Sequence, residues 1–303
     1  YAESIKNAQW VVVRCPREFL KGHFPNAINL PIFSDLEYEE IGTIYRKVGS
    51  VEATRVGREY AKKSTHYITK KISEMNCDNL IIYCARGGMR SKGVHEVLNK
   101  SIHNVYRIDG GYKSIRKFTL DGFSLARNVV VIAGSTGTGK TKIIKELNCQ
   151  NHNAIDLEEL ARHRGSAFGD LGIKTSVTQQ QFENELSYRW RRTSDSEPLF
   201  IESESRKIGK IVIPKGVWDQ MQGGYYIKIE VELSRRVENL MNEYGGYPID
   251  DHIERVNKIL NRLGGQNAKH AVSLLKQNEL EEFCKLLLEK YYDKMYNNAY
   301  ISR

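Results

Sequence analysis

The stretch NVVVIAGSTGTGKT at residues 128–141 decides the fold of the second half of the chain. Residues 128–133 form an apolar run of the length that a buried strand needs, and residues 142–147 are compatible with a helix. Between them, residues 134–141 fit the phosphate-loop pattern G-x-x-x-x-G-K-[ST] at every position. The strand before the loop and the helix after it make a chance glycine-rich turn a poor explanation. An α/β unit is therefore predicted here.

This loop is predicted to bind phosphate through its backbone. Its glycines let N–H groups turn onto phosphate oxygens, and the start of the following helix adds a favourable dipole. Lys140 would neutralise a terminal phosphate, and Thr141 would hold Mg²⁺. The motif predicts a bound phosphate without showing that the ligand is ATP. The predicted phosphate-binding residues are Gly134, Ser135, Thr136, Gly137, Thr138, Gly139, Lys140 and Thr141.

Acidic residues that could serve this loop follow two other apolar segments. Glu202 and Glu204 come at the end of a strand-like run, and Asp156 follows a short apolar step. A carboxylate in such a place can polarise a metal ion or activate water. Glu202 and Asp156 are therefore candidate site residues, whereas Glu204 and Glu158 are expected to be solvated surface acids.

The first half of the chain carries a cysteine in a loop of glycine and arginine, LIIYCARGGMRS at residues 80–91. A strand at 80–83 would deliver Cys84 to the start of a helix, where loop N–H groups and the helix dipole stabilise a thiolate. Core cysteines are rarely surrounded by two arginines and two glycines, so Cys84 is the predicted nucleophile. The predicted oxyanion-binding loop consists of Arg86, Gly87, Gly88, Arg90 and Ser91.

Two chemistries share this layout. The spacing from Cys84 to Arg90 is Cys-x5-Arg, as in cysteine phosphatases, where the thiolate attacks phosphorus and the arginine holds the phosphate. In sulfur carriers of the rhodanese type, the cysteine instead takes a sulfur or selenium atom as a persulfide or perselenide. A phosphatase would need a general acid, for which Asp35 and Asp109 are available. The loop by itself leaves both alternatives open.

The length and the alternation of predicted elements indicate two domains. The 303 residues, 40% hydrophobic and 27% charged, are typical of soluble globular domains. Apolar strands alternate with helix-compatible segments in both halves, which predicts parallel sheets. We expect a first domain at 1–120 and a second at 127–303, mainly helical and basic from about residue 233.

Charge and cysteine content suggest the partner and the compartment. The net charge of +9 favours a polyanionic partner such as nucleic acid, although a basic enzyme without one would look the same. Five scattered cysteines fit neither a disulfide framework nor a zinc site, so a reducing cytoplasm is expected. No apolar run approaches the roughly 18–20 residues that a membrane span needs.

The first domain resembles a rhodanese domain, and the whole chain resembles the bacterial tRNA 2-selenouridine synthase family. The rhodanese resemblance rests on the cysteine loop and on VVVRCPREFLKGHFPNAINLP (11–31) and YRIDGGYKSIRKF (106–118). The wider resemblance covers nearly the whole chain. It rests on segments that keep the family's order, namely CARGGMRS, GSTGTGKT, DLEELARHRGSAFG (156–169), ESESRKIG (202–209) and YYDKMY (291–296).

This resemblance implies a fold and an activity. The fold would be an N-terminal rhodanese-like parallel sheet domain followed by a phosphate-loop α/β domain with a helical, basic C-terminal part. The substrate would be tRNA with 2-thiouridine at the wobble position of the anticodon loop. Selenophosphate would replace the sulfur with selenium, through an S-geranyl-2-thiouridine intermediate made from geranyl diphosphate. Both are co-substrates, Mg²⁺ is a further expected ligand, and no tightly bound cofactor is expected.

The resemblance also points to site residues in the second domain. The phosphate loop would bind the diphosphate of geranyl diphosphate. Family segments further implicate Arg162, His163, Arg164, Ser166 and Arg206, which read alone would be a solvated basic face or a surface salt bridge. RNA contacts are predicted at Arg235, Arg236, Arg255, Lys258 and Arg262. Tyr291, Tyr292 and Tyr296 either stack on bases or pack as core, and core packing is preferred.

Two other hypotheses remain at this point. One is a Cys-x5-Arg phosphatase fused to a nucleotide-binding module, which would act on phosphoesters without tRNA. The other is a nucleotide-dependent kinase or switch whose rhodanese-like domain only docks partners, for which Cys84 would be dispensable. The match of five segments in order favours the selenium-transferring enzyme. The sequence predicts no oligomeric state.

Overall fold

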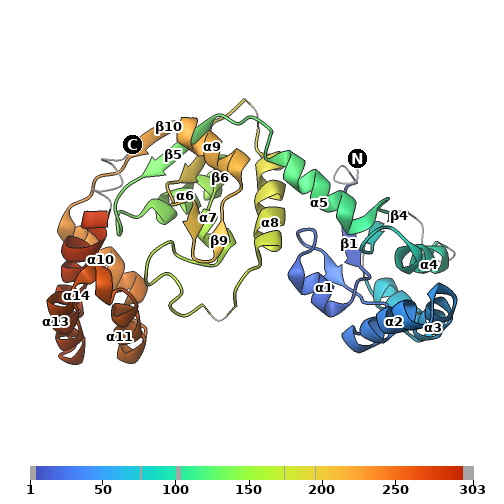
Figure 1. The fold of residues 1–303 in the computed structure, drawn as a ribbon. Helices are drawn as coiled ribbons and strands as arrows, with labels where there is room; N and C mark the ends of the chain where they lie inside the picture. Colours follow the sequence, from blue (N-terminus) through green and yellow to red (C-terminus); the bar gives the residue numbers. More distant parts are fainter. Residues whose placement is uncertain (1–4, 76, 100–103, 174, 195, 296–303) are drawn as a thin grey trace. The chain divides into compact units, whose positions relative to one another are not determined.

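The structure is a computed structural model that describes residues 5–75, 77–99, 104–173, 175–194 and 196–295 (Figure 1). The chain divides into two compact units, each with its own sheet. The first unit contains residues 1–122 and 183–188, and the second contains residues 123–182 and 189–303. Within the described ranges, no helix combines the length and the apolar character needed to cross a membrane.

The first unit is built on a four-stranded parallel sheet, which confirms the fold class predicted for the N-terminal domain. The strand order is β2-β1-β3-β4, so the most apolar strands, β1 and β3, lie in the centre. The strands are β1 (Ala8–Val12), β2 (Ile28–Asn29), β3 (Asn79–Tyr83) and β4 (Val105–Arg107). The helices are α1 (Pro16–Lys21), α2 (Asp35–Lys47), α3 (Ser50–Ser73), α4 (Met89–Leu98) and α5 (Gly111–Gly122).

Helices cover both faces of this sheet, because alternate side chains of a strand point to opposite faces. On one face, the strands pack with α3 and α4 through Val11, Leu80, Ile82, Ile68 and Val94. On the other face, they pack with α5 through Trp10, Val12, Ile81, Tyr112 and Ile115. Strands buried on both faces read as continuous apolar runs, which is why the sequence predicts them.

Helices α2 and α3 lie side by side in the first unit (Figure 1). A capping box starts α2: the Glu37 N–H donates to Ser34 Oγ at 3.3 Å, and the Ser34 N–H donates to the Glu37 carboxylate at 2.7 Å. Helix α3 buries Ala53, Ile68 and Ile72 along one side and leaves its other side in solvent.

The second unit is also built on a four-stranded parallel sheet, in the order β10-β5-β7-β6. The strand expected over 225–231 is shorter and ends at Lys228. The strands are β5 (Val129–Ala133), β6 (Ala154–Ile155), β7 (Leu199–Glu202) and β10 (Tyr225–Lys228), with a separate antiparallel pair, β8 (Lys207–Ile208) and β9 (Ile211–Val212). The helices among them are α6 (Lys140–Cys149), α7 (Leu157–Ala161), α8 (Gln179–Arg192) and α9 (Lys215–Gly223).

The remainder of the described chain is helical, as predicted from residue 233 onward. These helices pack on one another around a shared apolar core that includes Val237, Leu240, Val256 and Phe283. They are drawn in orange and red in Figure 1. The elements are α10 (Leu233–Tyr244), α11 (Ile249–Lys258), α12 (Leu260–Leu263), α13 (Gly265–Lys276), α14 (Leu280–Leu287) and the π-helix η2 (Leu288–Tyr292).

The middle of α8 belongs to the first unit, which the sequence did not indicate. Asn184 is 2% exposed and forms hydrogen bonds with several groups of that unit. Its Nδ2 donates to the His23 carbonyl at 2.7 Å and to the Tyr112 hydroxyl at 2.9 Å, and its Oδ1 accepts from Arg116 Nη1 at 2.7 Å. A buried amide with this many partners fixes the segment 183–188 in the first unit.

We predict that Asn184→Ala destabilises the first unit by about 2 kcal/mol, because the substitution leaves buried donors and acceptors without partners. Urea denaturation followed by circular dichroism measures the loss. A change below roughly 0.5 kcal/mol, the size typical of surface substitutions, would contradict the structural role of Asn184.

Candidate functional site

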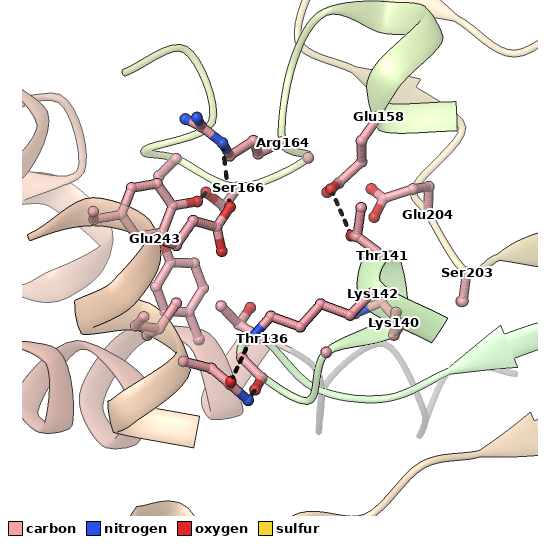
Figure 2. A pocket seen from close by; sticks show the side chains of 18 of the residues that line it. Thr136, Lys140, Thr141, Lys142, Glu158, Arg164, Ser166, Ser203, Glu204 and Glu243 are labelled. Atoms are coloured by element: carbon pink, nitrogen blue, oxygen red, sulfur yellow. Dashed lines mark hydrogen bonds and ion pairs between the residues drawn. The ribbon is translucent and has the colours of Figure 1, made fainter. Parts of the chain in front are cut away.

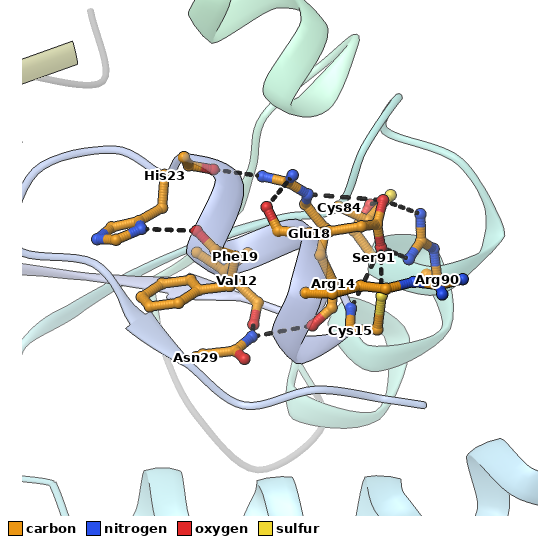
Figure 3. A network of polar contacts seen from close by, with 12 residues as sticks. Val12, Arg14, Cys15, Glu18, Phe19, His23, Asn29, Cys84, Arg90 and Ser91 are labelled. Carbon is orange, nitrogen blue, oxygen red and sulfur yellow. Dashed lines mark hydrogen bonds and ion pairs between the residues drawn. The ribbon is translucent and has the colours of Figure 1, made fainter. Parts of the chain in front are cut away.

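Strand β3 delivers Cys84 to the face of the sheet that α3 and α4 cover. Leu80, Ile82 and Cys84 alternate onto this face, and Cys84 is 2% exposed. Helix α4 starts at Met89, directly after the loop, so the thiol lies near a helix N-terminus as predicted. Its Sγ lies 3.2 Å from Ser91 Oγ (Figure 3). Strand end, loop and helix start thus converge on one sulfur atom.

The surroundings of Cys84 favour its thiolate. Burial alone would raise the pKa of Cys84. The Ser91 hydroxyl, the backbone N–H groups of Ser91 and Arg86, and the Arg90 charge act in the opposite direction and lower the pKa below its ordinary value. Hydrogen bonds to the charged form therefore outweigh desolvation, which is the condition for a reactive cysteine.

Two glycines allow the close packing of the backbone around the cysteine loop. Gly87 and Gly111 both have positive φ, +66° and +58°. A Cβ on Gly111 would overlap the Cys84 carbonyl oxygen and the Gly87 nitrogen, so only glycine fits. The Tyr112 N–H donates to that Cys84 carbonyl at 2.8 Å. The segment 109–112, Asp-Gly-Gly-Tyr, therefore packs directly against the loop, a role that the sequence did not reveal.

The two arginines of the loop have different surroundings. Arg86 is exposed, whereas Arg90 is mostly buried and pairs with Glu18 of α1, with Nη1 and Oε2 2.6 Å apart (Figure 3). Burial by itself would raise the pKa of Glu18. The hydrogen bond and the charge of Arg90 are the main influences that lower this pKa below its ordinary value. Glu18 also accepts a bond from the Cys15 thiol at 3.3 Å. Sequence reasoning missed Glu18; its only local signal is the capping-box spacing after Cys15.

The phosphate loop has the backbone that its motif requires. It lies between β5 and α6, and Gly137 and Gly139 have φ of +82° and +84°. A Cβ on Gly134 would lie 2.6 Å from Thr138 Oγ1 and 2.9 Å from the Ile229 carbonyl, so this position also needs glycine. Lys140 Nζ donates to the Gly134 carbonyl at 2.8 Å, which holds the cation over the loop.

Helix α10 holds the far side of this loop. Arg236 donates from Nε to the Thr136 carbonyl at 2.9 Å, and Asn239 donates from Nδ2 to the Gly137 carbonyl at 2.8 Å. Arg236 is 8% exposed and pairs with Asp293 at 2.6 Å. The predicted RNA contact at Arg236 is therefore wrong, because its guanidinium is used inside the protein.

Carboxylates surround Thr141 on the other side of the loop (Figure 2). Its Oγ1 donates to Glu158 at 3.1 Å and lies 3.3 Å from Glu202, and oxygens of Glu158, Glu202 and Glu204 lie within 4.8 Å of one another. The prediction that Glu158 and Glu204 are solvated surface acids is wrong. The parallel register, with Ile132 opposite Glu202, brings the end of β7 beside the loop.

Burial of these acids, together with their proximity to one another, raises their pKa values. Burial raises the pKa of Glu158 to about 8, and the neighbouring Glu204 adds to the rise. Burial and Glu158 raise the pKa of Glu202 well above its ordinary value. Gly165 permits this crowding, since a Cβ there would lie 2.5 Å from Glu204 Oε2 and 2.6 Å from Glu158 Oε1. Asp156, buried beneath, caps α7 by accepting the Glu159 N–H at 2.7 Å.

The loop and the carboxylates open into a cavity of about 540 Å³ within the second unit. Arg164, Ser166 and Glu243 line it opposite the phosphate loop (Figure 2). Arg164 pairs with Glu243 at 3.2 Å, and Ser166 Oγ lies 3.2 Å from the Tyr244 hydroxyl. The apolar part of the wall consists of Ala167, Leu240, Tyr244, Tyr291, Tyr292 and Met295.

Three other predicted residues do not line this cavity. Arg162 is exposed and donates to Thr175 at 3.1 Å, and Arg206 is exposed as well. The His163 ring packs between Gly169 and Gly209, where a Cβ would lie 2.8 and 2.6 Å from it. Of the family segment 156–169, Glu158, Arg164, Gly165, Ser166 and Ala167 line the cavity.

The tyrosines and basic residues expected to contact RNA are mostly used in packing or ion pairs. Tyr291 and Tyr292 are 5% and 6% exposed, which confirms the preferred core packing, although both also reach the cavity wall. Tyr296 lies outside the described residues. Arg255 pairs with Asp170 at 2.7 Å. Carboxylates of their own helices also pair with Arg235 and Lys258.

Comparisons with known proteins agree with this organisation. Residues 2–117 match the family model of the rhodanese-like domain, and residues 127–257 match that of the tRNA 2-selenouridine synthase AAA domain. A tRNA 2-selenouridine synthase of Nitrosomonas europaea is 35% identical over 79% of this chain and 64% of its own length.

Two further relatives match along most of both chains. The tRNA 2-selenouridine synthase of Shewanella frigidimarina is 31% identical over 96% of this chain and 88% of its own. The tRNA 2-selenouridine synthase of a Sulfurovum species is 33% identical over 97% of this chain and 89% of its own length. Since the similarity spans both units and their order, the chain belongs to the tRNA 2-selenouridine synthase family.

Proposed function

We propose that this protein converts 2-thiouridine at the wobble position of tRNA to 2-selenouridine, with selenophosphate as the selenium donor. Geranyl diphosphate would first alkylate the sulfur to S-geranyl-2-thiouridine, which turns a poor leaving group into a good one. Its family makes the chain a tRNA-modifying enzyme of the 2-selenouridine synthase type. The donor, the intermediate, the anticodon position and a cytoplasmic location, which the five free cysteines favour, belong to the proposal.

The geranyl step is inferred from the cavity of the second unit, which has one polar end and one apolar end. One end is the phosphate loop with Lys140, which suits a diphosphate. The other end is apolar and aromatic, with Leu240, Tyr291 and Met295, which suits a branched hydrocarbon chain better than a nucleotide base and sugar. In this assignment, Lys140 and the loop N–H groups stabilise the departing diphosphate.

The carboxylates beside Thr141 fit Mg²⁺. Their oxygens lie within 4.8 Å of one another, and Asp156 Oδ2 is buried without a hydrogen-bond partner among the described residues. An all-oxygen set of this kind is typical of magnesium and calcium. Thr141, Glu158, Glu202 and Glu204 would hold the ion, which would neutralise charge on the diphosphate.

The cysteine loop suits the selenium step without any oxidant. Selenium in selenophosphate is already a selenide: it forms the C2–Se bond, the C2–S bond breaks, and geranyl thiolate leaves. A perselenide on Cys84 would need an oxidant that selenophosphate does not supply. We therefore assign to the Cys84 thiolate an attack on phosphorus, which breaks the P–Se bond and releases 2-selenouridine. Water then frees phosphate from the resulting phosphocysteine.

Hydrolysis of ordinary phosphoesters is the alternative that the Cys-x5-Arg spacing leaves. It would require a general acid near the cysteine loop. Asp35, one of the two available acids, accepts a hydrogen bond from the Arg17 N–H at 3.0 Å at the start of α2. The family relation favours tRNA as the substrate.

Different substitutions should block the geranylation step and the selenium step separately. With 2-thiouridine tRNA, selenophosphate and geranyl diphosphate, we expect Lys140→Ala to lower geranylation at least about 100-fold. Cys84→Ala should still geranylate but yield no 2-selenouridine, and a trapped selenophosphoryl nucleoside would support attack on phosphorus. Mass spectrometry of the nucleosides measures both, with Lys215→Ala, an exposed lysine paired with Asp219, as control. Wild-type yields from Cys84→Ala would refute the assigned role of Cys84.

Ser91 should set the pH at which Cys84 reacts. Because its hydroxyl lies 3.2 Å from the sulfur and stabilises the thiolate, Ser91→Ala should raise the pKa of Cys84. The rate of iodoacetamide labelling of Cys84 against pH, read by peptide mass spectrometry, gives the midpoint. Ser73→Ala, an exposed serine at the end of α3, is the control. An unchanged midpoint would show that Ser91 does not stabilise the thiolate.

Mg²⁺ should stabilise the folded protein, and more so at higher pH. The pKa of Glu158 rises from 4.5 to about 8 on folding, so the folded state keeps protons that the unfolded chain releases, and stability falls as pH rises across this window. Mg²⁺ would replace those protons and add about 2.7 kcal/mol at a hundredfold excess over its Kd. Thermal unfolding at about pH 8 and pH 5 measures this.

The matched variants of this experiment lie next to each other on α7. Glu158→Gln should remove both the Mg²⁺ effect and part of the pH dependence. Glu159→Gln, whose exposed carboxylate pairs with Arg189 at 3.1 Å, should keep both. An equal shift by Mg²⁺ in wild type and Glu158→Gln would show that the ion does not bind at this cluster.

A further inference from the structure

The solvent side of α3 carries a row of cations that the proposed chemistry does not use. Three residues, Arg58, Lys62 and Lys70, lie at intervals of four or eight, with His66 between them, so they follow one side of the helix. Lys63 lies beside the row. This α3 basic face, opposite the buried side of the helix, consists of the exposed residues Arg58, Lys62, Lys63, His66 and Lys70.

Among the described residues, the cations of this row take part in no ion pair. Across the part of the chain that the structure describes, no carboxylate lies within 4.0 Å of the charged groups of Arg58, Lys62, Lys63 or Lys70. Other cations of the same helix are paired, Arg55 with Glu52 at 2.6 Å and Lys71 with Glu74 at 2.9 Å. Like charges four residues apart repel, so the row weakens the isolated helix unless an anion neutralises it.

Most of the second-unit cations at which the sequence suggested RNA contacts are used inside the protein or in ion pairs. Arg236 is buried against the phosphate loop, and Arg255 pairs with Asp170. Arg235 and Lys258 pair with glutamates on their own helices. Arg262, Lys269 and Lys276 are also exposed and in no ion pair among the described residues, but they lie seven residues apart. The unpaired cations of α3 therefore lie closer together along the chain than those of the C-terminal helices.

We propose that the α3 basic face binds the phosphate backbone of the tRNA substrate. The identity of the polyanion rests on the proposed function, whereas the location rests on the unpaired cations. From residue 58 to residue 70 the row extends about 18 Å along the helix, a length over which a nucleic acid strand presents several phosphates. Contacts to phosphates position the RNA and do not read its sequence.

The helix that carries this row is fixed to the core that also holds the thiol. Ile68 and Ile72 of α3 belong to the same buried cluster as Cys84 and Val94. A strand of RNA held on the outer side of α3 would thus have a defined position relative to the cysteine loop. The basic face and Cys84 therefore belong to the same compact unit.

Two double variants on this one helix test the proposal. Lys62→Gln/Lys70→Gln removes two unpaired cations, and Arg55→Gln/Lys71→Gln removes two paired ones. Both lower the net charge equally and differ only in which side chains are lost. Binding of 2-thiouridine tRNA is measured by fluorescence anisotropy at several salt concentrations, with circular dichroism to verify folding.

We expect the basic-face variant to bind tRNA about 10- to 100-fold more weakly at low salt. Its slope of log K against log salt should fall by about two. The paired-cation variant should stay within about threefold of wild type, with the wild-type slope. Equal losses in both variants, or no loss in either, would overturn the proposed surface. In those cases retained 2-selenouridine formation by wild type would leave the proposed function intact, whereas a wild type that binds no tRNA would refute both.

Discussion

The second unit depends on the burial of several carboxylates beside one phosphate loop. Strand β7 pairs in parallel with β5, so Glu202 arrives next to the loop at the same edge of the sheet. Glu158 from α7 and Glu204 from the following loop join it around Thr141. Like charges this close disfavour full ionisation unless a cation or protons compensate. The charge of Lys140 and the absence of a side chain at Gly165 accommodate that electrostatic constraint.

In the first unit, the electrostatic constraint is the stabilisation of a buried thiolate by N–H groups, a hydroxyl and a cation. A buried thiol would normally keep its proton, yet the N–H groups of the loop, Ser91 and Arg90 favour the thiolate of Cys84. Gly111 and Tyr112 hold that loop through its backbone, and Glu18 holds Arg90. In both units the reactive groups sit at the carboxyl ends of parallel strands, where ligands of open α/β sheets bind.

The C-terminal helices do more than provide a basic surface. Helix α10 binds the carbonyls of the phosphate loop through Arg236 and Asn239, and η2 closes the cavity with Tyr291 and Tyr292. These helices therefore shape the apolar end of the cavity and orient the loop at its polar end. Four of their cations where the sequence suggested RNA contacts, Arg235, Arg236, Arg255 and Lys258, are paired, whereas α3 carries a closely spaced row of exposed cations.

The sequence by itself determined the parallel α/β class, the phosphate loop, the Cys84 loop and the helical C-terminal part. These features depend on short-range rules: apolar runs, glycines at special dihedral angles, and a helix that starts after a loop. Only the tertiary structure decided that Glu158 and Glu204 cluster with Glu202 beside Thr141, that Arg236 is internal, that Glu18 pairs with Arg90, and that part of α8 belongs to the first unit. The reason is that a carboxylate or a guanidinium looks the same in any sequence. Its partner, often more than fifty residues away, determines whether it is solvated, paired or placed beside a substrate.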